Sequence, residues 1–239
     1  MLETGTTIDW AGALLWLVGI AGGAFLISWV LTDLLQVRRA AYVGALAALT
    51  GGLTAGYVAW SGAGAGFWVD GWAWGLLAAA LAGTFLALMV SRVPGARSTR
   101  RTGAIASVWE GLVYGSAEGL LLSVLPVVVT WQMLAALGWT GGWRGAAGAA
   151  AVAASAVVIA VHHLGYREYR GRRIVSPIIA CTVLSIAYLL TASPIAAIGG
   201  HIVLHLAMLR RGMELPPHAG PGPAHTAEER EARVMEMAS

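Results

Sequence analysis

The chain has 239 residues, of which 58% are hydrophobic and only 11% are charged, and its mean hydropathy is +0.72. A soluble globular domain carries about 25% charged residues, so this composition excludes a single soluble domain. It predicts an all-α, polytopic helix bundle, a multi-pass protein of the cell membrane. The only cysteine, Cys181, excludes an intramolecular disulfide.

About seven segments are long and apolar enough to span a bilayer, which takes about 20 residues for each helix. They lie near residues 10–35, 40–60, 67–91, 105–137, 144–164, 174–191 and 194–210.

Every basic residue is an arginine, and the arginines follow the first, third, fifth and seventh segments. These are Arg38, Arg39, Arg92, Arg97, Arg100, Arg101, Arg167, Arg170, Arg172, Arg173, Arg210 and Arg211. The opposite loops carry Glu3, Asp9, Asp70 and only Arg144. Because basic loops stay on the cytoplasmic side, we expect the N-terminus outside and the C-terminus in the cytoplasm.

The segments suggest three regions: an N-terminal three-helix membrane region (1–104), a four-helix core (105–211) and a Pro- and Gly-rich, disordered cytoplasmic tail (212–239). The N-terminus lacks the basic region of a cleavable signal peptide, so we expect the first helix to remain as an anchor. The net charge of +3 comes from the arginine loops, which predicts membrane lipids as partners. No nucleic-acid motif is present, and we expect no nucleic-acid partner.

The last segment carries His201 and His205, four residues apart and therefore on one face of a helix. An ionisable side chain at membrane depth costs roughly 2.5 to 3.5 kcal/mol, so such residues usually face a polar cavity and act there. This spacing suits two ligands of a single metal ion, or one ligand and its neighbour.

The other ionisable residues at membrane depth are Glu110 and Glu118 in the fourth segment and His162 and His163 at the end of the fifth. Carboxylates with imidazoles form a ligand set that suits zinc. His163 can share a level with His205, whereas His162 points about 100° away and is the reserve ligand.

The fourth segment is too long for one upright span, so we expect it to be tilted or broken, with Pro126 able to kink it. If the segment is upright, Glu110 becomes the nearer carboxylate, and it is kept in reserve. Otherwise Glu110 is an interfacial carboxylate paired with an arginine.

Three motifs occur in order along the second half of the chain. A Glu-Glu-x-x-x-Arg motif is resembled by Ser116-Ala-Glu118-Gly-Leu-Leu-Leu-Ser123. A Phe-x-x-x-His motif is resembled by Ile159-Ala-Val-His-His163. The third motif, a helix that ends in Tyr-Leu and a turn before His-x-x-x-Asn, is resembled by the run from Cys181 to His205. Together they are similar to the motifs of the CPBP family, the CAAX-protease and bacteriocin-processing intramembrane peptidases. The chain departs from that pattern at Gly119, Ser123, Ile159 and His205.

The resemblance implies an intramembrane endopeptidase that acts on a membrane-associated peptide or protein. In this interpretation Glu118 is the general base that activates water, and His163, His201 and His205 orient that water or hold a metal ion. The imidazole of His205 in place of an Asn favours a metal ion, with zinc as the expected cofactor.

Two other classes of function stay open. One is a haem-binding protein with His163 and either His201 or His205 as axial ligands, and the other is a non-proteolytic metal-binding, immunity or scaffold protein that keeps the CPBP-like fold. A retinal protein is excluded because the chain has no lysine. The ceramidase-like hydrolases need a histidine in the second helix, where residues 40–60 have none.

Overall fold

The computed structural model describes residues 9–92 and 103–211. The expected tail (212–239) and the predicted loop residues Glu3, Arg97, Arg100 and Arg101 lie outside the described residues. Every regular element in the described part is a helix, which confirms the predicted all-α class. The elements are α1 (Trp10–Ser28), η1 (Trp29–Leu34), α2 (Arg39–Ser61), α3 (Gly66–Val69), α4 (Trp72–Arg92), α5 (Ala104–Ala106), η2 (Ser107–Val113), α6 (Tyr114–Glu118), η3 (Gly119–Val124), α7 (Leu125–Ala136), η4 (Gly141–Trp143), α8 (Arg144–Leu164), η5 (Arg167–Tyr169), η6 (Arg172–Ile174), α9 (Val175–Thr191) and α10 (Pro194–Arg210).

Six helices of the described chain are long and apolar enough to cross a membrane, which makes this a membrane protein. They are Trp10–Leu34, Arg39–Ser61, Trp72–Arg92, Ser107–Ala136, Gly141–Leu164 and Arg172–Thr191. The seventh expected span is the shorter apolar helix α10, whose 17 residues lie at the lower limit for crossing a bilayer. The predicted seven spans therefore correspond to six full-length helices and one shorter helix.

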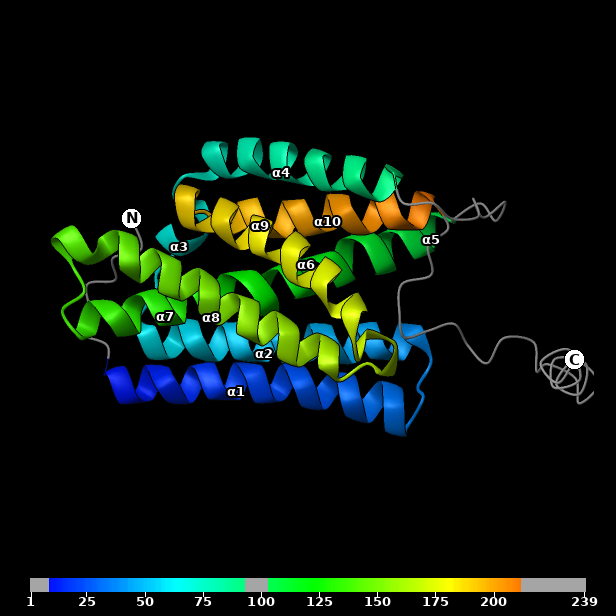
Figure 1. Ribbon diagram of the computed structural model, residues 1–239, viewed down its shortest axis with the longest axis horizontal. Helices are drawn as coiled ribbons and strands as arrows, with labels where there is room; N and C mark the ends of the chain where they lie inside the picture. The colour runs from blue at the N-terminus through cyan, green and yellow to red at the C-terminus, as the bar shows by residue number, and fades with distance from the viewer. Residues whose placement is uncertain (1–8, 93–102, 212–239) are drawn as a thin grey trace, which may run out of the picture.

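Successive long helices run in opposite directions along the bundle, so that Trp10 and Arg210 lie at opposite ends (Figure 1). The described arginines that follow α1 and α8, and those that end α4 and α10, therefore gather at one end, and Arg144, which begins α8, lies at the other. We call the first of these the arginine end. Its assignment to the cytoplasm stays a prediction of the positive-inside bias.

The segment from α5 to α7 forms one continuous helix through the middle of the bundle. In this span 72% of the most apolar stretch is buried within the protein, against 17–39% in the other five. Of the two expected alternatives, tilted or broken, the break is not seen in the described segment: two π-helical stretches, η2 and η3, keep the helix continuous, and Pro126 lies at the start of α7, directly after η3. A widened turn leaves room for the proline ring, so the helix continues past it.

The third expected span does not begin at residue 67. The short helix α3 covers Gly66–Val69, and α4 starts only at Trp72. Between them Gly71 adopts a φ of +63°, the left-handed region that favours glycine, and this turn separates the two helices.

Glycines let the central helix touch α10 backbone to backbone. A Cβ added at Gly115 would lie 2.9 Å from the Cα of Ile202, and one added at Gly119 would lie 2.8 Å from the Cα of Ile198. The two glycines are four residues apart and share one face of the helix. Small residues at such positions allow close packing of membrane helices, and here they fix the distance between the central helix and α10.

We predict that Gly119→Ala lowers the free energy of unfolding by about 1–3 kcal/mol, because the added methyl group overpacks a backbone contact. Gly52→Ala is the matched control, since a Cβ at Gly52 meets nothing within 4 Å. Thermal unfolding in detergent should show a lower midpoint for Gly119→Ala and an unchanged or higher midpoint for Gly52→Ala. Equal midpoints for the two variants would contradict the close packing.

Candidate metal centre

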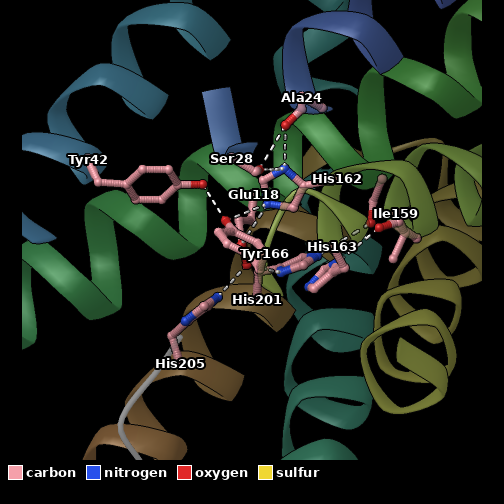
Figure 2. Close-up of polar contacts among 11 residues, drawn as sticks. Ala24, Ser28, Tyr42, Glu118, Ile159, His162, His163, Tyr166, His201 and His205 are labelled. Atoms are coloured by element: carbon pink, nitrogen blue, oxygen red, sulfur yellow. Dashed lines mark hydrogen bonds and ion pairs between the residues drawn. The ribbon is translucent and has the colours of Figure 1, made fainter. Parts of the chain in front are cut away.

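Three buried side chains from two neighbouring helices converge in the interior. Glu118 is the last residue of α6, and His201 and His205 lie one turn apart on α10. One ligand atom from each of the three lies within 4.8 Å of the others, so the group could hold a metal ion. In Figure 2 the carboxylate of Glu118 lies between His205 and His162.

One oxygen of Glu118 faces both histidines of α10. Its Oε2 lies 2.8 Å from the Nε2 of His205 and 3.9 Å from the Nδ1 of His201. Ligand atoms that share a tetrahedral zinc ion at about 2.0–2.2 Å are separated by about 3.4 Å. The two observed distances fall on either side of that value, and all three ligand atoms lie within 4.8 Å of one another, so the group could hold a metal ion after small side-chain movements.

The hydrogen bonds of His201 leave its Nδ1 available. The hydroxyl of Ser123 donates to the carbonyl oxygen of Cys181, so it accepts from the Nε2 of His201 at 3.4 Å. The Nδ1 atom then carries a lone pair, and this buried atom has no hydrogen-bond partner within the described part of the chain. A buried polar atom without a partner costs about 1–3 kcal/mol, and a metal ion would satisfy it.

His205 is held by contacts on both sides. Its Nε2 donates to Glu118, and its ring centroid lies 4.7 Å from that of Tyr114. The rings of His201 and His205 are nearly parallel, with an interplanar angle of 20° and centroids 6.2 Å apart. The spacing of four residues predicted this shared face.

A third histidine, His162 of α8, lies against the other oxygen of Glu118. Its Nε2 is 3.6 Å from Oε1, which is an ion-pair distance. On the opposite edge of the ring, Nδ1 donates to the carbonyl oxygen of Ala24 at 3.0 Å and lies 2.8 Å from the hydroxyl of Ser28. Both of these partners belong to α1, so the first helix takes part in the site.

Two tyrosines extend the polar group toward the arginine end. The hydroxyl of Tyr166 lies 3.0 Å from the Nε2 of His162, and it shares a further hydrogen bond with the hydroxyl of Tyr42. Tyr166 follows α8, and burial raises the pKa of its hydroxyl well above 10, so it stays protonated. Tyr42 lies in the first turn of α2.

His163 and Glu110 are not members of this three-residue group, although the ring of His163 lies beside that of His162, with centroids 5.1 Å apart. The Nδ1 of His163 turns back to the carbonyl oxygen of Ile159 at 2.8 Å, because consecutive residues of a helix point about 100° apart and His162 occupies the inward direction. Glu110 pairs with Arg39 at 3.0 Å, as expected for an interfacial carboxylate. The group that could hold an ion thus consists of Glu118, His201 and His205 rather than the expected three histidines.

Sequence reasoning did not identify Ser28, Tyr42, Ser123 or Tyr166 as part of the site. One signal was present, since Tyr166 follows His162 by four residues and falls on the same side of a helical turn. The other three come from helices whose rotation in the bundle is set by tertiary packing.

Comparisons with known proteins do not assign this site to a family. The chain matches no protein-family model, no curated protein and no solved structure. A function for the chain must therefore be argued from the site itself and from the motif resemblance.

Proposed function

We propose that the chain is an intramembrane, zinc-dependent hydrolase related to the CPBP peptidases, and that it cleaves a membrane-associated peptide or protein. The observation that carries the proposal is the convergence of Glu118, His201 and His205 inside an apolar bundle. Ionisable groups are costly at membrane depth, and a bound ion gives all three a common partner.

The ligand set matches the chemistry of a catalytic site. One carboxylate and two imidazoles are a common zinc set in hydrolases, where three protein ligands leave the fourth position open. A zinc ion bound there would supply a Lewis acid and lower the pKa of its bound water to near 7. The chain would hold the ion through Oε2 of Glu118, Nδ1 of His201 and Nε2 of His205. For the last of these, His205 would carry its hydrogen on Nδ1, which has no hydrogen-bond partner among the described residues. The CPBP resemblance assigns water activation to Glu118. As a ligand through Oε2, Glu118 would serve that step by holding the ion that lowers the pKa of the water.

The departures from the CPBP motifs favour a metal ion over a pair of glutamates. A side chain at Gly119 would collide with the backbone of α10, which leaves no room there for the second Glu of the motif. Ser123, in place of Arg, lies beside His201, and His205, in place of Asn, brings an imidazole to Glu118. These exchanges give the site an additional nitrogen ligand in place of a second carboxylate.

The contacts weigh against a haem. In that alternative His163 is one axial ligand, and its ring already packs edge-on against the rings of His162 and Tyr169, with centroids 5.1 and 5.0 Å away. Glu118 and Tyr114 already contact His205, so a haem would have to displace them.

Zinc should stabilise the folded chain through these three residues. In metal-free protein, zinc at 100 times its Kd is expected to raise the free energy of unfolding by about 2.7 kcal/mol, since it binds the folded state. Thermal unfolding with added zinc measures the effect, and magnesium serves as the control because it prefers oxygen ligands. The proposal fails if zinc leaves the wild type unchanged or stabilises the His201→Ala, His205→Ala double variant equally.

Hydrolysis should depend on Glu118 and not on Glu110. Protein in liposomes with a mixture of membrane-anchored peptides is expected to release fragments detected by mass spectrometry. Glu118→Gln should slow cleavage at least about 100-fold, because it removes the charged group on which water activation depends. Glu110→Gln, from the same helix, should retain cleavage. Zinc binding without any cleavage would instead support the non-proteolytic alternative.

A further inference from the structure

The two carboxylate oxygens of Glu118 face in opposite directions. Oε2 faces His201 and His205 on α10, whereas Oε1 faces the Nε2 of His162 on α8. A glutamate side chain has three rotatable bonds, and its orientation in a cavity depends on what holds both oxygens. His162 is the group that the structure provides for the second oxygen.

The His162 ring is itself fixed in direction. Its Nδ1 lies within hydrogen-bond distance of both the Ala24 carbonyl oxygen and the Ser28 hydroxyl, and that hydroxyl also donates to Ala24 at 2.8 Å. A carbonyl oxygen only accepts, so Nδ1 carries a hydrogen. The Glu118 carboxylate also only accepts, so the form of the ring that holds Oε1 carries a second hydrogen on Nε2. Any rotation of the ring would break both bonds to α1.

The other contact of Nε2 comes from Tyr166, which is bonded to Tyr42. These contacts join the Glu118 carboxylate to α1, α2 and the turn after α8 (Figure 2). None of these three segments contributes a candidate metal ligand. All of these side chains are buried, so water does not compete for the bonds.

We propose that His162 is the positioning residue of the metal centre: it holds Oε1 of Glu118 so that Oε2 stays directed at His201 and His205. The inference rests on the proposed metal centre and adds to it a residue that binds no metal itself. Partners that orient a metal-binding carboxylate are typically worth 10- to 100-fold in metal affinity.

Simple packing is the competing role for His162, because its ring also lies edge-on to the rings of His163 and Tyr166, with both centroids 5.1 Å away. The two roles predict opposite effects for two substitutions of His162, by phenylalanine and by glutamine. Phenylalanine keeps the aromatic ring and loses the nitrogen, whereas glutamine loses the ring and can place an amide near the position of Nε2.

The test is a titration of the detergent-purified full chain with Co²⁺, a spectroscopic probe for zinc sites, in wild type, His162→Phe and His162→Gln. The thermal midpoint of each metal-free protein is measured alongside. We expect His162→Phe to bind Co²⁺ about 10- to 100-fold more weakly than wild type. Its thermal midpoint should nevertheless be higher than that of His162→Gln, because it keeps the aromatic ring. His162→Gln should bind at least about threefold more tightly than His162→Phe, despite a lower midpoint.

Two conservative variants test the same claim without disturbing the ring packing. Tyr166→Phe removes one hydrogen bond to His162 and should weaken Co²⁺ binding about 2- to 10-fold. Tyr57→Phe is the matched control, because Tyr57 is also a buried tyrosine but its hydroxyl donates to Gln132 rather than to a histidine of the site. It should bind Co²⁺ like the wild type.

The outcomes separate the two proposals. If the wild type binds neither Co²⁺ nor zinc, the metal centre is refuted and the positioning role with it. If the wild type binds but His162→Phe binds equally well, or better than His162→Gln, the metal centre stands and the positioning role is overturned. Equal weakening by Tyr166→Phe and Tyr57→Phe would also overturn it, since the loss would then follow stability alone.

Discussion

The close contact between the central helix and α10 is the constraint on which the site depends. Gly115 and Gly119 let the two backbones approach until an added Cβ would lie within 3 Å of the α10 Cα atoms. Glu118 is next to one of these glycines, so the same approach brings its carboxylate to His205. Larger residues at the glycines would separate the helices and leave the carboxylate and the imidazoles buried without each other.

Burial explains why these ionisable groups are collected in one place. A lone carboxylate or imidazole in an apolar interior is costly unless it is paired and hydrogen-bonded. Glu118 contacts His162 on one side and His205 on the other, and the hydroxyl groups around the histidines occupy most of the remaining positions. Among the described residues the Nδ1 atoms of His201 and His205 are left over, and that of His201 lies 3.9 Å from Oε2 of Glu118, where a shared ion would give it a partner.

Sequence patterns predicted the helices well, because a bilayer-spanning segment can be recognised from its length and hydropathy alone. They also predicted that His201 and His205 share a face, since a spacing of four fixes that locally. They did not predict that His162, rather than His163, would face Glu118. That choice depends on how α8 is rotated about its axis, which is set by contacts with α1 that are distant in sequence.

The most direct test of the metal centre is the metal content of the purified protein, measured by inductively coupled plasma mass spectrometry on wild type and His201→Ala. The account predicts about one zinc ion per chain in the wild type, because three ligands define one tetrahedral site, and loss of that ion in the variant. Wild-type protein without a stoichiometric metal ion, or with a content that His201→Ala leaves unchanged, would contradict it.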